Sequence, residues 1–499
     1  MSMTVDSGQL WHGTTFVFWN EIIDEAAIGK FLPAEHAQLA RPIKEALVVF
    51  LRSLPQRWQQ SILAEQIKLP PTTTLAVRLG HLARRCPVLH KLGQVLARDD
   101  RLSEELRREL RPLESLPPAD HGHELRDALV HELGDLEARG VTWLGPPIAE
   151  ASVAVVLPFR DERSTTLRDG VFKVLKPNIE ERLELELEVF SDVGAHLDER
   201  CTELQIPPLD YQDAFEQVRD KLRWEMRLQQ EQRHLTDAAR FYRNDHEVQI
   251  PRLSEHCSPR VTAMERIYGA KVTDYVACAA ERKRIARVVS RTLLASPIYA
   301  KQSQAMFHGD PHAGNLLYTC DGKLALLDWS LVSYLGESER IVMTQIVLAA
   351  ITLDAQSIVS LLRTLDSTSR ASRQDLQTVV DKWLRPIHRG QLPGLLWLVG
   401  LMDDVTQATR LRMGPDMMMF RKSLHTLTGV VRDLGGTDAD IEATLLREFV
   451  LRFASELPTR WLAYPTSRAF ATRLSNFDLT TTALRWPLAT AQRLCGGEG

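Results

Sequence analysis

Three polar side chains past the middle of the chain have the types and the spacing that phosphoryl transfer requires. Asp310 and Asn315 are 5 positions apart in the segment HGDPHAGN, and Asp328 follows Asn315 by 13 positions in LLDWS. Such a reaction needs a carboxylate that orients or deprotonates the acceptor, together with oxygen ligands that hold Mg²⁺ on the phosphates. We predict that Asp310 is the catalytic carboxylate and that Asn315 and Asp328 bind Mg²⁺ with ATP.

The residues between Asn315 and Asp328 predict a β-hairpin. The apolar segments LLYT and KLALLD lie on either side of the turn-forming residues 320–322. A hairpin here would return Asp328 to the side of Asn315. Because the spacings and this topology agree, the pattern indicates more than a loop that is rich in the turn-forming residues Gly, Asp, Pro and Asn.

The same loop offers a different kind of site. His308, Asp310 and His312 stand at alternate positions and could together bind a transition metal. No further histidine cluster lies nearby in the sequence. We therefore favour a role for His308, and in the same way for His312, in bracing the loop.

Lys173 is the predicted ligand of the phosphates. It lies in the apolar strand segment GVFKVL, where a buried lysine is costly unless it is paired. A phosphate-binding lysine held by a glutamate from a helix meets this requirement, whereas the alternative is an edge-strand lysine that points to solvent. Lys176, which follows the strand and directly precedes Pro177, is the weaker candidate.

The segment before Lys173 lacks a glycine-rich loop of the form G-x-G-x-x-G. Residues 147–154, with the sequence PIAEASVA, stand in its place. Without glycines the backbone is less free to fold over phosphates. The sequence therefore argues against an ordinary Ser/Thr/Tyr protein kinase.

Over about residues 89–365 the chain resembles the UbiB/AarF family of atypical kinases. The most specific mark is a K-x-G-Q motif in a helical extension, here KLGQ from Lys91 to Gln94. The family's HxDPHxGN motif stands as HGDPHAGN, and Asp328 takes the place of the aspartate in the DFG-like motif. The resemblance implies a protein-kinase-like fold, ATP binding or hydrolysis, a link to isoprenoid-quinone or other lipid metabolism, and an extension that obstructs peptide substrates.

The resemblance also assigns site residues. Glu225 and Glu231 match two glutamates of the family, and Glu231 would pair with Lys173. The alternatives for that partner, as in ordinary kinases, are Glu184, Glu186 and Glu188. The residues implied in catalysis are Asp310, Lys173, Glu231, Lys91 and Gln94. Those implied in cofactor binding are Lys173, Ala149, Ala151, Ser152, Val153, Ala154, Glu265 and Ile267, and those implied in metal binding are Asn315 and Asp328.

Four features depart from the family's pattern. Arg227 stands where an aspartate is expected, and this reversal of charge puts in doubt any role that needs the carboxylate. The DFG-like motif reads DWS, so Ser330 replaces the flexible glycine. The family has an alanine-rich loop in place of the glycine-rich one, which Ala149, Ala151, Ser152 and Ala154 match; Glu150 interrupts this alanine run, and Val155 replaces a glutamine. The last three changes suggest an altered nucleotide preference or slow turnover.

The order of apolar patterns predicts an α+β chain. Spacings of three and four residues indicate helices at both ends, and short β-rich pieces separated by turn residues begin near residue 141. With the resemblance, this predicts a protein-kinase-like two-lobed fold with an N-terminal helical extension carrying K-x-G-Q and a long helical C-terminal region. The expected parts are an N-terminal helical region at 1–75, the K-x-G-Q extension at 76–140, a lobe with a small sheet and helices at 141–270, a lobe with the catalytic and metal loops at 271–365, and the C-terminal helical region at 366–499.

Composition narrows the classes of function. With 61 basic and 65 acidic residues, the formal net charge of −4 gives no basic excess of the kind that nucleic-acid binding needs. The six cysteines show neither metal-ligand spacing nor a disulfide framework, and no apolar run approaches the ~20 residues that span a bilayer. We expect a cytoplasmic, bacterial protein without a transmembrane helix, and peripheral contact with a membrane is left open.

Two other functions remain open on the sequence. Small-molecule phosphotransferases of the aminoglycoside or choline kinase type also use an HGDxHxGN loop followed by Asp-Trp, so residues 307–330 alone do not exclude them. Arg227 and Ser330 would also suit a pseudokinase scaffold that binds nucleotide without turnover. The expected partners are ATP, with Mg²⁺, and a small-molecule or lipid acceptor that the sequence does not identify.

Overall fold

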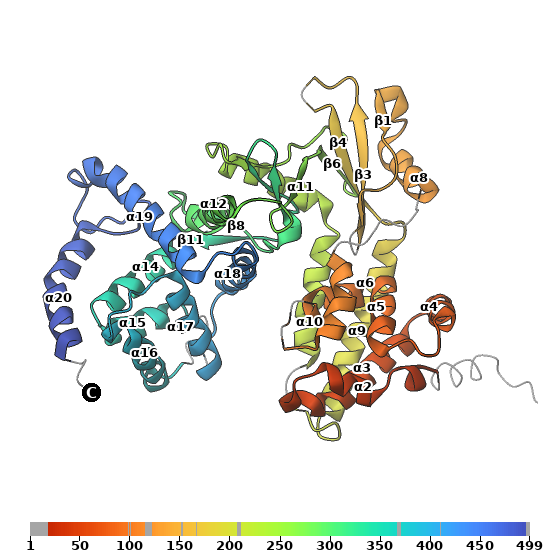
Figure 1. Cartoon of the computed structure of the whole chain (residues 1–499), viewed down its shortest axis with the longest axis horizontal. Helices are drawn as coiled ribbons and strands as arrows, with labels where there is room; N and C mark the ends of the chain where they lie inside the picture. Colours follow the sequence, from red (N-terminus) through yellow and green to blue (C-terminus); the bar gives the residue numbers. More distant parts are fainter. Residues whose placement is uncertain are drawn as a thin grey trace, which may run out of the picture. The chain divides into compact units, whose positions relative to one another are not determined.

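Figure 1 shows the computed structural model of the chain, which describes residues 18–97, 99, 101–114, 122–150, 153–165, 167–206, 211–366, 371–409 and 411–495. The chain divides into two compact units. Unit 1 consists of Met1–Arg233 and Arg252–Arg266, and unit 2 consists of His234–Pro251 and Ile267–Gly499. Each unit is therefore built from two separate stretches of sequence.

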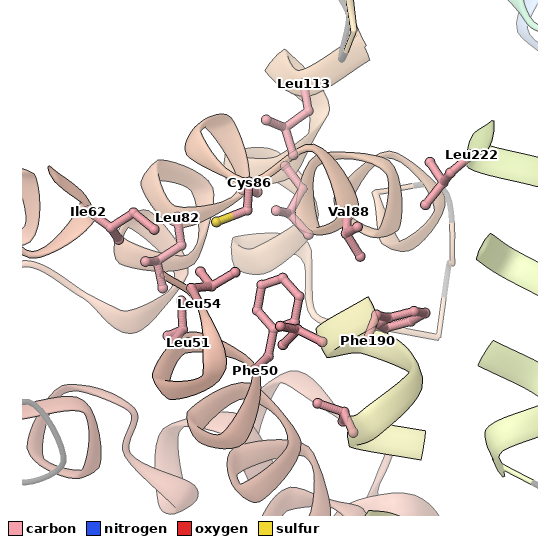
Figure 2. Close-up of a cluster of buried hydrophobic side chains, with 14 of the residues drawn as sticks. Phe50, Leu51, Leu54, Ile62, Leu82, Cys86, Val88, Leu113, Phe190 and Leu222 are labelled. Atoms are coloured by element: carbon pink, nitrogen blue, oxygen red, sulfur yellow. The ribbon is translucent and has the colours of Figure 1, made fainter. Parts of the chain in front are cut away.

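Helices make up the larger part of unit 1, and most of them share one apolar core. Figure 2 shows this core, in which the buried side chains Phe50, Leu82 and Phe190 come from three different helices. Apolar residues at helical spacing place these side chains on the inner faces of their helices. The helices are α2 (Glu25–Phe31), η1 (Ala34–Leu39), α3 (Ala40–Ser53), α4 (Gln56–Lys68), α5 (Leu75–Arg85), α6 (Pro87–Leu96), α7 (Glu104–Leu110), η2 (Arg111–Glu114), α8 (Gly122–Leu133), η3 (Glu137–Arg139), α9 (Ile179–Arg200) and α10 (Tyr211–Glu225).

Unit 1 also contains a five-stranded antiparallel sheet. Its order is β1-β3-β4-β6, and β2 pairs with β3 as well. The strands are β1 (Val141–Trp143), β2 (Ala149–Glu150), β3 (Ala154–Asp161), β4 (Asp169–Leu175) and β6 (Val261–Glu265). Phe159 on β3 stacks on Phe172 of β4 with ring centroids 4.1 Å apart, which forms part of a second apolar core. Helix α11 (Leu228–Phe241) begins in unit 1 and ends in unit 2.

Unit 2 combines two small sheets with many helices. One sheet has the order β5-β10-β9-β7 and the other pairs β8 with β11. The strands are β5 (Val248–Gln249), β7 (Gly269–Lys271), β8 (Gln304–His308), β9 (Leu316–Thr319), β10 (Leu324–Leu326) and β11 (Val332–Gly336). The helices are α12 (Ala279–Ser290), η4 (Arg291–Ala295), α13 (Ser296–Ile298), η5 (Ala313–Asn315), α14 (Glu337–Ile351), α15 (Ala355–Thr364), α16 (Arg373–His388), α17 (Leu395–Ala408), α18 (Pro415–Asp433), α19 (Asp438–Arg460) and α20 (Asn476–Cys495).

The mixed helix and sheet class predicted from the sequence is confirmed, as is the predicted hairpin. Strands β9 and β10 are antiparallel, with Leu316 opposite Leu326, and Gly322 takes the left-handed φ of 81° that their turn requires. In unit 2, β5 pairs in parallel with β10. Among the described residues, no helix is long and apolar enough to cross a membrane. The five expected segments remain predictions.

Candidate functional site

Lys173 forms a buried ion pair inside unit 1. Its Nζ donates to both carboxylate oxygens of Glu231, at 2.8 and 2.9 Å. The lysine lies on β4, between Val156 of β3 and Thr262 of β6, and the two side chains are only 11% and 4% exposed. The alternative of an edge-strand lysine pointing to solvent is therefore wrong. The expected pairing is present, and its role in holding phosphates stays a prediction.

The glutamates of α9 that could have served as partners have other contacts. Glu184 accepts from Arg223 Nε at 2.9 Å. Glu186 accepts from Val88 N and from Arg182 Nε, each at 3.1 Å. For the described part of unit 1, Glu231 on α11 is thus the carboxylate bonded to Lys173. Helix α11 is held against the sheet by Gln232, whose Nε2 donates to Val261 O of β6 at 3.1 Å.

The edge formed by β2 and β3 carries the residues predicted to cover a nucleotide. Ala149 lies opposite Val156 in the β2–β3 pairing, and Val153 and Ala154 are buried at the start of β3. Ala151 and Ser152 lie outside the described residues. Glu265, at the end of β6, forms an ion pair with Arg252 at 3.2 Å. Ile267, the first residue of the second stretch of unit 2, is half-buried.

Two of the departures from the family pattern have structural explanations. Glu150 pairs with Lys176 at 2.7 Å, and both side chains are mostly buried, so the carboxylate that interrupts the alanine run is neutralised by its neighbour. Burial lowers the pKa of Lys176 from its ordinary value. Val155 is fully buried in the core of the sheet, where a glutamine would need hydrogen-bond partners.

The K-x-G-Q motif lies on α6. Gln94 Nε2 donates to Leu113 O at 2.8 Å, and His90 Nε2 contacts the same carbonyl oxygen at 2.9 Å. Gly93 packs so closely on η2 that a Cβ atom there would lie 2.5 Å from Leu113 Cδ1. The glycine of the motif thus permits close helix packing, and the glutamine fixes that packing. Lys91 is half-buried on the same helix.

The predicted catalytic loop of unit 2 is braced by its histidines. His308 is fully buried, with Nε2 2.9 Å from Leu327 O, while its Nδ1 accepts from Asp310 N at 3.2 Å. These two bonds suit a neutral ring, and burial lowers the pKa of His308. His312 Nδ1 accepts from Gly314 N at 3.1 Å. In the described part of the chain, His308, Asp310 and His312 do not gather three ligand atoms, so the transition-metal alternative loses its support.

Asn315 and Asp328 lie side by side along the hairpin. Leu327 N donates to Asn315 O at 2.9 Å, which brings the end of β10 to the start of β9. Asp328 has a left-handed φ of 51°, an uncommon conformation that functional sites often retain. Trp329, the next residue, is fully buried, and its Nε1 donates to Leu326 O at 3.1 Å. The Trp of the DWS motif therefore anchors the turn that presents Asp328.

The donor set of these two residues fits Mg²⁺. Asn315 Nδ2 donates to Asp310 O at 3.1 Å, so the amide nitrogen is turned to the backbone and the amide oxygen is the atom that could serve as a ligand. Asp328 adds a carboxylate. Both are the hard oxygen ligands that Mg²⁺ prefers, which it commonly combines with water and phosphate oxygens.

Two residues near the loop gave no signal in the sequence. Lys422 on α18 places Nζ 3.9 Å from Asp310 Oδ1, and Ser423 Oγ donates to His308 O at 2.8 Å. Both follow the loop by more than 100 positions and belong to no motif.

Arg227, in the short connection between α10 and α11, is exposed. Glu225 ends α10, and its side chain is outside the described part.

Comparisons with known proteins find similarity to kinase-like proteins. Residues 123–362 match the family model described as the ABC1 atypical kinase-like domain. The chain is 28% identical over 345 residues to the uncharacterized protein Rv0647c of Mycobacterium tuberculosis, covering 64% of each. It is 29% identical over 245 residues to a probable protein kinase UbiB of Shewanella baltica, covering 47% of this chain and 42% of that protein.

A solved structure of Rv3197 from Mycobacterium tuberculosis in complex with erythromycin is also similar. It aligns with a TM-score of 0.49 at 17% sequence identity, over 71% of this chain and 89% of that one. The chain spans less than two thirds of the length of the two curated relatives named above. The match over residues 123–362 shows that this region of the chain is similar to the ABC1 atypical kinase-like family.

Proposed function

We propose that this chain is a UbiB-type atypical kinase or ATPase that binds Mg-ATP and transfers its γ-phosphate to water or to a small-molecule or lipid acceptor. The observation that carries the proposal is the buried pair of Lys173 and Glu231 on the sheet of unit 1. An apolar pair of similar volume would often stabilise a fold as well or better. Because the Lys173–Glu231 pair is charged although it is buried, its best explanation is a role in binding an anion.

The residues that the family resemblance assigns to ATP would hold the nucleotide. Lys173 would bind the α- and β-phosphates, and Glu231 would orient the ammonium group before the nucleotide arrives. The backbone around Ala149, Val153 and Ala154 would cover the phosphates, a role that we also propose for Ala151 and Ser152. Glu265 and Ile267 would contact the base, and Lys91 and Gln94 would complete the site from α6.

The residues of unit 2 would carry out the transfer. Asp310 would orient the attacking hydroxyl or water and accept its proton. The Asn315 amide oxygen and the Asp328 carboxylate would hold Mg²⁺, which when bound neutralises charge on the phosphates. His308 would keep the loop in shape through its two backbone contacts.

A lipid or other small molecule is a better acceptor candidate than a peptide. The match to the ABC1 atypical kinase-like model supports an ATP-using kinase-like function, and the similarity to proteins named UbiB favours isoprenoid-quinone or other lipid metabolism. The resemblance to kinases in which the K-x-G-Q extension obstructs peptide substrates points the same way. The class of acceptor is thus proposed together with the activity.

The decisive experiment replaces one aspartate with asparagine at the predicted metal site, and makes the same replacement at a second aspartate on the same hairpin as a control. The purified chain is mixed with Mg-ATP, and phosphate release and nucleotide binding are measured. We expect Asp328→Asn to lower the rate by about 100-fold or more. Asp321→Asn is the matched control, because Asp321 is exposed at the tip of the same hairpin and pairs with Lys323; it should leave the rate nearly unchanged.

Other outcomes would change the proposal. Nucleotide binding without turnover, with lipid or phenolic additives present, would contradict catalysis and favour a pseudokinase scaffold. Equal rates for wild type and Asp328→Asn would contradict the metal assignment. A Lys91→Ala variant with altered hydrolysis would support the UbiB-type assignment, whereas no effect would favour a phosphotransferase of the aminoglycoside type.

A further inference from the structure

A large apolar cavity lies among the helices of unit 1, apart from the residues assigned above to the nucleotide. Its volume is about 1030 Å³, and its wall comes from α2, α3, α5, α6, α7, α9 and α10. Figure 2 shows three of the lining side chains, Phe50, Leu82 and Phe190, inside the helical core. Sites for small molecules generally occupy about 300–1,000 Å³ and are mostly apolar. The cavity is therefore of the size of a ligand site.

The sequence directs whole apolar stripes toward this cavity. On α3 the stripe consists of residues 43, 46, 47 and 50, and on α6 it consists of residues 89, 92, 93 and 96. These spacings of three and four residues place each set on one face of its helix. In a close-packed interior such stripes meet other side chains and leave few voids. Here they surround open space instead.

The cavity reaches the surface, so an empty cavity would be wetted. Its lining includes His36 and Gln38, which are exposed, and Leu96, which is 42% exposed. Water against apolar wall costs about 25 cal/mol for each Å² left uncovered. An apolar occupant would remove that cost, whereas ions or small polar molecules would not.

The lining also defines the polar end of such an occupant. Among the described residues the lining contains no Asp, Glu, Lys or Arg, and its hydrogen-bonding side chains are His36, Gln38, Gln205 and Tyr211. A carboxylate or phosphate inside would find no cation among these residues to pair with and would be costly to bury. An uncharged hydroxyl or carbonyl could bond to these groups.

An aromatic wall suits a flat or extended chain. Phe190 and Phe215 stack with ring centroids 4.2 Å apart and planes within 4°, and both line the cavity. We propose that the cavity binds one long-chain apolar molecule with an uncharged polar end, of the class of long-chain alcohols. The proposal does not depend on nucleotide chemistry, because its test needs no ATP.

The test uses the full chain without nucleotide and all-trans-retinol as the probe. Retinol fluorescence should saturate at one molecule per chain, and oleyl alcohol should displace it. Oleate, with the same chain length and a charged end, should compete about tenfold less well or worse. Absence of saturable retinol binding by the unmodified chain would overturn the proposal, whatever any variant does. Equal competition by oleate and oleyl alcohol would overturn the assignment of an uncharged end.

Two variants locate the binding. Ala46→Phe adds a ring inside the cavity and should weaken retinol binding by about tenfold or more. Ala26→Phe makes the same change on the exposed side of α2 and should leave binding unchanged. Thermal unfolding of both variants shows whether each is folded, and Ile43→Trp fills the cavity from a second position. Unchanged binding in folded Ala46→Phe and Ile43→Trp would place the ligand elsewhere and overturn the proposal.

Discussion

The pair of Lys173 and Glu231 makes a direct prediction about stability. Replacing Lys173 with Met leaves the Glu231 carboxylate, which is 4% exposed, without its bonded ammonium group. Breaking a buried pair from one side costs about 3–5 kcal/mol. We expect Lys173→Met to lower the free energy of unfolding in urea by about that amount, and ATP binding to fall with it.

The double variant Lys173→Met with Glu231→Met shows whether the stability loss in Lys173→Met comes from the missing contact or from the buried charge left on Glu231. Because both charges are removed, its stability should recover to within about 1–2 kcal/mol of wild type. Arg126→Met is the surface control: Arg126 and Glu137 are 2.9 Å apart, with side chains 63% and 77% exposed, so the loss should be below about 1 kcal/mol. A double variant no more stable than Lys173→Met would contradict this account.

At the same scale, local sequence predicts where candidate site residues lie when they are close in the chain. Asp310, Asn315 and Asp328 lie within one loop and one hairpin, so their spacing and turn residues largely determine which of them meet. Lys422 and Ser423 reach the same loop from α18. Their approach depends on how distant helices pack, and nothing in the residues around them indicates it.

The N-terminus of helix α6 is hydrogen-bonded to a buried carboxylate whose pKa is raised. Glu186 is fully buried and accepts from Val88 N in the first turn of α6, where a negative charge is favoured. Burial nevertheless raises the pKa of Glu186 from 4.5 to about 7. Because the folded state holds the proton more tightly than the unfolded chain, this residue contributes stability at low pH that is lost as the pH rises from about 4.5 to about 7.

Glu186→Gln should remove that dependence. Relative to wild type, the variant's free energy of unfolding should rise between pH 4.5 and pH 7 by up to about 3 kcal/mol, since one pKa unit corresponds to about 1.4 kcal/mol. Any difference in hydrogen bonding between the amide and the protonated carboxyl adds an amount that does not depend on pH. Urea unfolding at several pH values measures the trend, and a difference that does not change with pH would contradict it.

His90 on the same helix supplies the opposite trend. Burial lowers the pKa of His90 from 6.5 to about 4, so its contribution to stability is present above pH 6.5 and is lost as the pH falls toward 4. Relative to wild type, His90→Gln should therefore gain stability as the pH falls. The two variants act as controls for each other, because a general effect of pH would shift both in the same direction.

Packing of α6 on η2 gives a further prediction at this scale. A side chain at Gly93 would meet Leu113 Cδ1 at 2.5 Å in a buried contact, so Gly93→Val should lower the free energy of unfolding by about 1–3 kcal/mol. Gly429 on α18 is the control: it is exposed, with no atom within 4 Å of an added Cβ. Gly429→Val should be neutral or slightly stabilising, and equal losses at both positions would count against a packing effect.

At the scale of the whole molecule, the order of helical and strand-rich segments was predictable because each follows from local periodicity. The division of the chain into two compact units was not. Residues 234–251 lie in sequence between two parts of unit 1 but belong to unit 2, where β5 pairs with β10. A two-residue strand carries too little periodicity to reveal its partner, and parallel pairing with a distant strand leaves no turn signal nearby.

The C-terminal helices complete the core of unit 2, which predicts how truncation will act. Ser423 donates to His308 O at 2.8 Å, Phe420 meets the ring of Phe307 with centroids 5.5 Å apart, and Arg473 donates to Ala300 O at 2.8 Å. A chain that ends at residue 366 lacks all three contacts and leaves β8, the strand before the predicted catalytic loop, uncovered. We expect it to aggregate or to bind a dye specific for exposed apolar surface, as measured by gel filtration and dye fluorescence.

A shorter truncation tests whether the core contacts, rather than length alone, decide this outcome. A chain that ends at residue 480 keeps Arg473 and also Asp478, which accepts from Arg468 at 3.0 Å. It loses Leu484 and Leu488, which are 73% and 68% exposed and contribute little burial. This chain should stay monodisperse and unfold near the wild-type temperature. If the chain ending at 366 also remained compact with native near-UV circular dichroism, the C-terminal helices would be dispensable for unit 2. The long-range bonds to His308 and Ala300 would then not be what holds β8 in place.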